Sequence, residues 1–153
     1  MSFGAIVNDF STGVVTALSS MTRISGNGIK RILVPTDFSE YSDMALQLAI
    51  DLARQQNAKI ILMHVLRSGD AHEELEMMQR QIARFPDLKD IEITPEIRKG
   101  KIYKEILAAE SDDNADLIIL SRHHRADSLL SLFPGISSKV RRTARSSVLV
   151  VGA

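Results

Sequence analysis

The sequence predicts an α/β fold in which a five-stranded parallel sheet is sandwiched by helices, preceded by an N-terminal amphipathic helical extension. One observation and one topological rule lead to this fold class. From residue 29 onward, short apolar runs typical of strands alternate with segments whose apolar residues recur at helical spacing. Strands linked by helices run parallel, and right-handed crossovers restrict the topology to a doubly wound sheet of the Rossmann or flavodoxin type.

The first strand is predicted at 31–35, where the sequence reads RILVP. A helix follows over 39–56, because apolar residues such as Leu48 and Leu52 recur at steps of three and four. The sequence AKIILMHVL at 58–66 predicts a second strand. Its apolar residues on both faces favour an interior position in the sheet.

A charged helix is predicted over 70–85, with Leu75, Met78 and Ile82 along one side. The third strand lies within 90–100. The first half of that segment alternates apolar and polar residues, which is typical of a strand near a sheet edge.

The second half of the chain repeats the alternation. A short helix is predicted over 102–111, and ADLIIL at 115–120 is the fourth strand. A further helix over 137–144 leads to SSVLVVGA at 146–153, the fifth strand.

Residues 1–28 do not follow this alternation of strands and helices. They are predicted to be an amphipathic helix and hinge, whereas 29–153 are predicted to form the α/β domain. The apolar stripe of this helix contains Phe3, Ile6, Phe10, Val14 and Leu18. The helix can pack on its own domain, on a twin subunit or on a protein partner. Contact with a membrane surface is disfavoured, because Asp9 and Arg23 are the only charged residues of the segment.

Composition excludes several classes of protein. The 153 residues contain 19 basic and 19 acidic side chains, a balance that gives no support for nucleic-acid binding. The absence of cysteine excludes disulfides, thiolate metal sites and cysteine nucleophiles. No apolar run reaches the ~20 residues that cross a bilayer, and no secretory signal is recognisable, so we expect a cytoplasmic protein.

Candidate binding residues follow the first strand in the sequence VPTDFSE. This sequence puts Thr36 and Asp37 at the carboxyl end of a strand, where doubly wound sheets bind ligands. Asp37 can accept a hydrogen bond from a nucleotide base or ribose. It can equally join Ser39 in capping the helix that follows, and the sequence leaves both roles open.

The chain from Lys30 to Ala153 resembles the universal stress protein family. The resemblance rests on KRILVPTDFSEYSDMALQLAIDLARQQNAKIILMHV, on GKIYKEILAAESDDNADLIILS and on SSKVRRTARSSVLVVGA. It implies a homodimer formed by antiparallel pairing of the last strands, here Val148–Val151. An apolar edge strand also exposes unpaired backbone groups unless another strand covers it.

Members of this family that bind ATP carry a glycine, two residues, a glycine, nine residues, and then glycine followed by serine or threonine. The matching positions here are Ser121, His124, Pro134 and Gly135, so the three glycines are replaced. A histidine side chain occupies space that phosphates need, proline has no N–H to donate, and serine adopts positive φ only at a cost. We therefore expect no bound ATP and no other cofactor.

Basic residues after the fourth strand leave an alternative open. In it Thr36 and Asp37 hold the adenosine of ATP with Mg²⁺, Val65 lines the base pocket, and Ser121, Arg122 and Arg125 hold phosphates. The same basic run can also be a solvated helix face or a protein-docking surface.

No catalytic motif such as GxSxG or a Walker loop is present, and no HxxxH or HExxH spacing predicts a metal site. The first hypothesis is a non-enzymatic, dimeric stress-response module that acts through protein partners. The alternative is a nucleotide-binding switch with at most weak ATPase activity.

Overall fold

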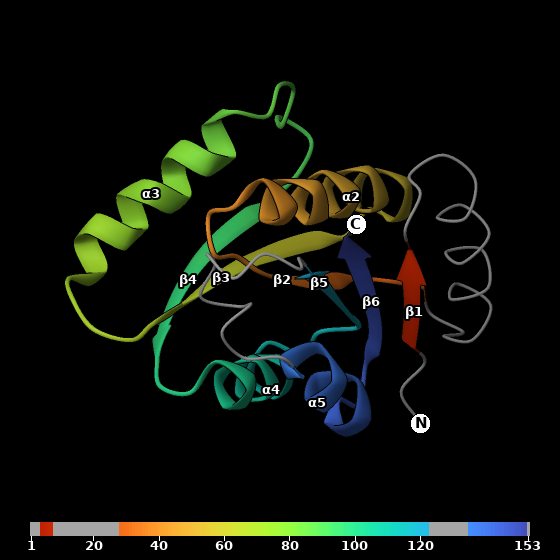
Figure 1. Cartoon of the computed structure of the whole chain (residues 1–153). Helices are drawn as coiled ribbons and strands as arrows, with labels where there is room; N and C mark the ends of the chain where they lie inside the picture. The colour runs from red at the N-terminus through yellow and green to blue at the C-terminus, as the bar shows by residue number, and fades with distance from the viewer. Residues whose placement is uncertain (1–3, 8–27, 123–134, 153) are drawn as a thin grey trace.

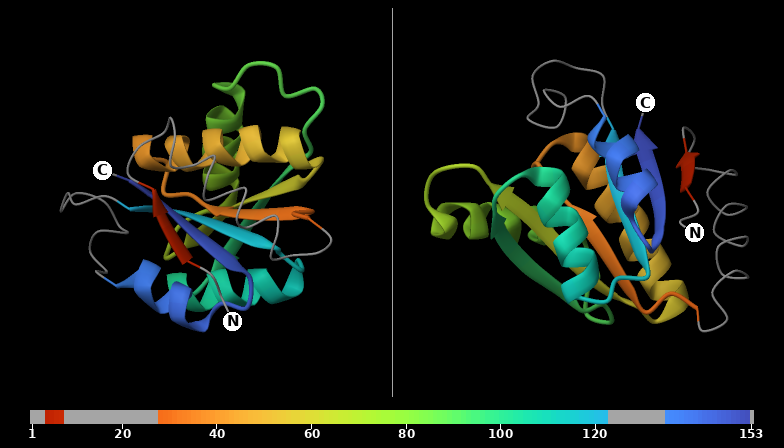
Figure 2. Two further views of the ribbon diagram at one scale, coloured as in Figure 1. Left: turned by 90° about the vertical axis from the view of Figure 1, so that its right-hand side faces the viewer. Right: turned by 90° about the horizontal axis from the view of Figure 1, so that it is seen from below.

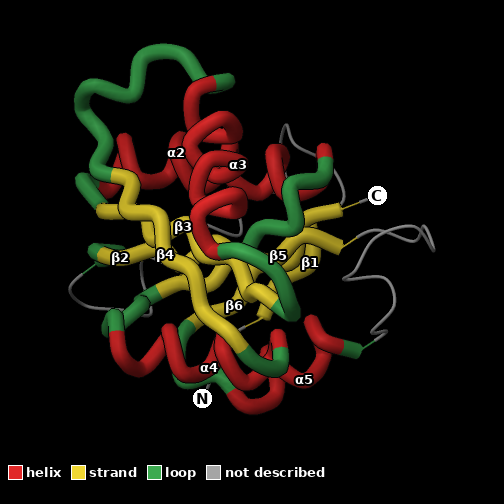
Figure 3. Tube along the Cα trace, turned by 90° about the vertical axis from the view of Figure 1, so that its left-hand side faces the viewer, coloured by secondary structure: helices red, strands yellow, loops and turns green. Residues whose placement is uncertain are grey.

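The computed structural model describes residues 4–7, 28–122 and 135–152 as a parallel sheet with helices on both faces (Figure 1). The sheet order is β1-β6-β5-β2-β3-β4, and every neighbouring pair of strands runs parallel. Helices α2 and α3 lie on one face, and α4 and α5 on the other, so that the sheet is the middle layer (Figure 3).

The strands are β1 Gly4–Val7, β2 Arg31–Pro35, β3 Lys59–Leu66, β4 Ile93–Lys99, β5 Leu117–Arg122 and β6 Ser147–Gly152. The helices are α2 Glu40–Gln56, α3 Ala71–Ala83, α4 Ile102–Asp112 and α5 Ile136–Thr143. The five strands and four helices predicted after residue 28 are thus confirmed.

Alternation along the strands divides the core into two layers. Ile32 and Val34 of β2 pack under α2, whereas Leu33, between them, packs on the opposite face near α4 and α5. All three side chains are fully buried. This is the pattern expected when successive side chains of a strand point to opposite faces of a sheet that helices cover on both sides.

The helices differ in how deeply they are buried. α2 buries eight of its residues across the centre of the sheet and ends at Asn57, whose left-handed φ of 54° stops the helix. α3 buries only Met78 and Gln81, and it lies toward the β4 side of the sheet (Figure 1). In the described part of the chain, no helix is long and apolar enough to span a membrane.

The helix predicted over residues 1–28 is wrong for Gly4–Val7. These residues form β1, which pairs with β6 in the register Gly4↔Val148 to Val7↔Val151 (Figure 2). Glycine disfavours a helix, and the β-branched side chains of Ile6 and Val7 favour a strand. Backbone pairing with an open sheet edge therefore prevails over helical spacing. The rest of the predicted apolar stripe lies outside the described residues.

Adjacent methionines of α3 test the predicted depth of burial. Met78 is fully buried in the core beneath α2, whereas Met77 is 37% exposed. Met78→Ala is expected to lower the free energy of unfolding by about 2–5 kcal/mol, and Met77→Ala to change it by less than about 0.5 kcal/mol. Urea unfolding measures both values, and equal losses would contradict the burial described here.

Candidate functional site

The carboxyl ends of β5, β2 and β3 meet where the strand order reverses. From β2 the chain continues to β3 and β4 on one side, whereas β5 leads to β6 on the other. Doubly wound sheets bind their ligands at this point. The predicted site residues at these strand ends are Thr36, Asp37, Val65, Ser121 and Arg122. The sixth, Arg125, lies outside the described residues.

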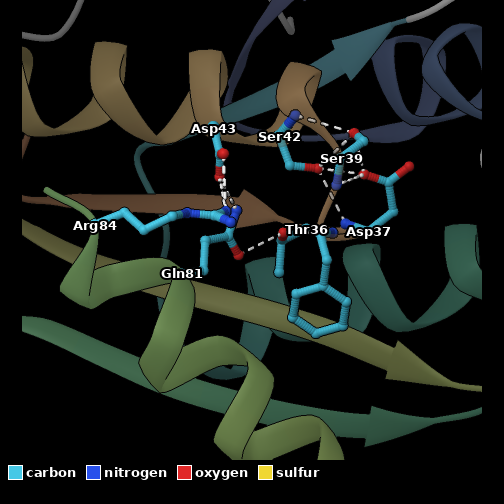
Figure 4. A network of polar contacts seen from close by, with 8 residues as sticks. Thr36, Asp37, Ser39, Ser42, Asp43, Gln81 and Arg84 are labelled. Atoms are coloured by element: carbon cyan, nitrogen blue, oxygen red, sulfur yellow. Dashed lines mark hydrogen bonds and ion pairs between the residues drawn. The ribbon is translucent and has the colours of Figure 1, made fainter.

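Asp37 takes part in the capping of α2 (Figure 4). Its Oδ1 accepts a hydrogen bond from the Ser39 amide at 3.1 Å and from the hydroxyls of Ser39 and Ser42. The Ser42 hydroxyl in turn accepts from the Asp37 amide at 3.0 Å, and Ser39 caps the Ser42 amide. One carboxylate oxygen and two hydroxyl oxygens therefore accept hydrogen bonds from backbone amides near the start of the helix.

A second chain of polar contacts links β2 to α3 (Figure 4). The Thr36 hydroxyl donates to Gln81 Oε1 at 2.8 Å, and Gln81 Nε2 donates to Asp43 at 2.8 Å. The Arg84 guanidinium contacts both carboxylate oxygens of Asp43, at 2.7 and 2.8 Å. Thr36 and Gln81 are almost fully buried, so these contacts satisfy polar groups that would otherwise be costly to bury.

The sequence hypotheses did not include Gln81, Asp43 or Arg84. One signal was present: Gln81 follows Met78 by three residues and so lies on the buried side of the predicted helix, where a polar side chain needs a partner. Its partners come from residues about 40 positions away, and only the fold reveals them.

His64, near the end of β3, contacts the backbone at the carboxyl end of β2. Its Nδ1 lies 2.8 Å from the Thr36 carbonyl oxygen and its Nε2 lies 3.5 Å from Glu74. Because a carbonyl only accepts, Nδ1 carries the proton in this contact. The ring of Phe38 stacks against the imidazole with 4.6 Å between ring centres. His64 is therefore a packed, hydrogen-bonded residue at the rim of the site.

One cleft that the described residues form at these strand ends is small. A cleft between β2, β3 and the start of α4 has a volume of about 20 Å³, which is room for about one water molecule. Its lining residues are Pro35, Thr36, Asp37, Met63, His64, Val65, Arg67 and Ile102. Val65 is thus next to Thr36 and Asp37, but these side chains surround a cleft far smaller than a nucleoside.

At the end of β5, Ser121 is 9% exposed and its hydroxyl has no hydrogen-bond partner in the described part of the chain. Arg122, the next residue, is exposed. Gly135 precedes α5 with a φ of 104°, a conformation that favours glycine. His124 and Pro134 lie outside the described residues.

One basic residue of the last third of the chain contacts an aromatic ring. The Lys139 ammonium of α5 lies 4.9 Å from the centre of the Tyr103 ring of α4, a cation–π contact between two helices on the same face of the sheet. Among the described residues, no group of three or more histidine or acidic side chains is arranged to hold a metal ion.

Comparison with known proteins identifies the family. The model of the universal stress protein family matches residues 28–152. The chain belongs to the universal stress protein family.

Relatives of this family show how far the likeness extends. The universal stress protein MJ0531 of Methanocaldococcus jannaschii is 25% identical over 150 residues, which cover 88% of each chain. Among solved structures, the protein MJ0577 is 24% identical with a TM-score of 0.68, over 82% of this chain and 96% of that one. A universal stress protein in complex with cAMP is 22% identical with a TM-score of 0.62, over 80% and 96%. These two structures establish the shared fold.

A cluster of charges lies between β4 and the end of α4. The Arg98 guanidinium contacts Glu96 and lies 2.9 Å from Asp112 and 3.9 Å from Asp113. One cation thus faces three carboxylates. Burial, together with the hydrogen bond and charge of Glu96, raises the pKa of Asp113 to about 6.

This raised pKa predicts a pH-dependent effect of one substitution. Because the folded state holds the Asp113 proton more tightly than the unfolded chain, its contribution to stability is present below about pH 3.8 and lost as the pH rises through about 6. Asp113→Asn, which cannot ionise, is expected to raise the melting temperature at pH 7.5 by about 2–4 °C, roughly 1 kcal/mol. At pH 4 the difference from the unsubstituted chain should nearly vanish.

Asp112→Asn is the matched control, because the Asp112 side chain is 64% exposed and its pair with Arg98 is expected to contribute little. Thermal unfolding followed by circular dichroism gives both profiles. Destabilisation by Asp113→Asn at pH 7.5 would contradict the raised pKa.

Proposed function

We propose that this chain is a non-enzymatic regulatory module of the universal stress type that does not retain ATP and acts through protein partners. One observation carries the proposal: the polar groups at the carboxyl end of β2 bond to the protein itself. Thr36 donates to Gln81, and Asp37 accepts from Ser39 and Ser42. A nucleotide that used the same atoms would have to replace these bonds, each worth about 0.5–1.5 kcal/mol.

Two further features support a site that does not hold ATP. The cleft beside Asp37 and Val65 has a volume of about 20 Å³, whereas ligand pockets usually measure about 300–1,000 Å³. The glycines of the phosphate-binding motif are replaced at Ser121, His124 and Pro134. Proline cannot donate a backbone N–H, so at least one contact to phosphate is lost.

The proposed module acts as a homodimer through Val148–Val151 and binds a protein partner through the segment 1–28. A balanced charge of 19 basic and 19 acidic residues gives no reason to propose a nucleic-acid partner. The proposed place of action is the cytoplasm.

A nucleotide-binding switch is the second candidate, favoured by a separate observation. Ser121 has a buried hydroxyl without a hydrogen-bond partner among the described residues, and it lies at the switch point of the sheet. A solved universal stress protein of the same fold is in complex with cAMP. On this reading Ser121, Arg122 and Arg125 contact phosphate, and Thr36, Asp37 and Val65 contact the nucleoside.

Melting temperatures with and without 5 mM ATP–Mg²⁺ separate the two functions. The unsubstituted chain is expected to show no shift. A variant that restores the three glycines of the motif, Ser121→Gly with His124→Gly and Pro134→Gly, is expected to gain stability in the presence of ATP–Mg²⁺. A dissociation constant of 50 µM would stabilise it by about 2.7 kcal/mol, a shift of roughly 5–10 °C.

A clear shift in the unsubstituted chain would contradict the proposal. Ser121→Val then decides whether the switch is correct, because it replaces the buried hydroxyl with an apolar side chain that suits a strand. Loss of the shift in Ser121→Val would establish the second candidate.

A further inference from the structure

The two edges of the sheet are protected in different ways. β4, at one edge, contains Pro95, which lacks an N–H, and the charged residues Glu96, Arg98 and Lys99. Proline and charges are the usual means by which an edge strand avoids pairing with another chain. The β4 edge is therefore protected by its own sequence.

β6 has no such protection in its sequence. It reads SVLVVG, with neither a charge nor a proline, and Val148–Val151 are at most 1% exposed. Leu149 and Val151 pack in the core layer of α2, whereas Val148 and Val150 pack in the layer of α4 and α5. The side chains are thus enclosed by the chain's own helices. Only the backbone N–H and C=O groups of β6 can pair with a neighbouring strand.

β1 covers that edge. Gly4–Val7 pair with Val148–Val151 in parallel, one residue to one residue, and the views of Figures 1 and 2 agree that β1 lies directly beside β6. The covered residues are the same four through which the homodimer was proposed above. One edge of a strand can pair with one neighbour at a time, so β1 and a second copy exclude each other.

We propose that Gly4–Val7 is a removable cover of the β6 edge, which must leave that edge before a second copy of this chain can pair there. This inference rests on the proposed dimer and is independent of ATP. A two-fold axis brings two β6 strands together antiparallel, and the same four uncharged residues then face each other without like-charge repulsion.

The cover is short enough to be displaced. β1 has four residues, and the net gain from its few backbone hydrogen bonds is of the same size as the entropy cost of ordering four residues. Parallel pairing is also slightly less stable per residue than the antiparallel pairing of a dimer. The balance between the covered monomer and the dimer can therefore change with protein concentration.

A full-length variant with two prolines in β1, Ala5→Pro with Ile6→Pro, tests the cover. Successive N–H groups of a strand point to opposite sides, so one of the two prolines removes a donor to β6. Sedimentation equilibrium over a wide concentration range is expected to give a dimer dissociation constant at least ten-fold lower than that of the unsubstituted chain. Ser11→Pro with Thr12→Pro, in the same extension but outside β1, should leave the constant unchanged.

Hydrogen exchange of the unsubstituted protein gives a second measurement that needs no variant. Those amides of Gly4–Val7 that donate to β6 are expected to be protected in dilute monomer and to lose protection as dimers form, while Val148–Val151 stay protected throughout. Protection of Gly4–Val7 that rises with concentration would overturn the inference, because β1 would then pair with the other copy.

The dimer dissociation constants distinguish failure of the proposed cover from failure of the proposed dimer. If dimers form with equal affinity with and without the prolines, the cover is overturned and the dimer stands. If the folded double-proline variant remains monomeric at every concentration, the proposed dimer fails, and the cover with it.

Discussion

The polar contacts that follow β2 determine the arrangement of the domain around them. Asp37 and Ser39 fix where α2 begins, and α2 supplies much of the core on its face of the sheet. Thr36 and Gln81 connect the same strand end to α3, which buries only two residues of its own. A helix with so little buried surface depends on directed contacts for its position, and the Asp43–Arg84 ion pair adds another.

This arrangement has a direct consequence for function. Side chains at the carboxyl end of β2 can serve a ligand or the fold, and the two uses compete for the same lone pairs and protons. In this chain Thr36 and Asp37 bond to the protein, and the cleft that the described residues form beside them has a volume of about 20 Å³. A member of the family built in this way keeps the fold and its surfaces, which is compatible with the protein-binding module proposed above.

The sequence predicted the alternation of strands and helices after residue 28, because apolar periodicity reports which faces are buried. It also raised both roles of Asp37, but periodicity carries no information on which partner a carboxylate meets. The Thr36–Gln81 contact and the Glu96–Asp113 pair join residues far apart in the chain, and only the fold brings them together. Gly4–Val7 were mistaken for helix because an open edge elsewhere in the fold decides their conformation.

The stability of Asp37→Ala tests most directly whether this strand end serves the fold. The substitution removes an acceptor of three hydrogen bonds at the start of α2 and should lower the free energy of unfolding by about 1–2 kcal/mol. Asp51→Ala, on the exposed side of the same helix, should change it by less than about 0.5 kcal/mol. Unchanged or increased stability of Asp37→Ala in urea would contradict the account, because a carboxylate reserved for a ligand is often a burden on the folded state.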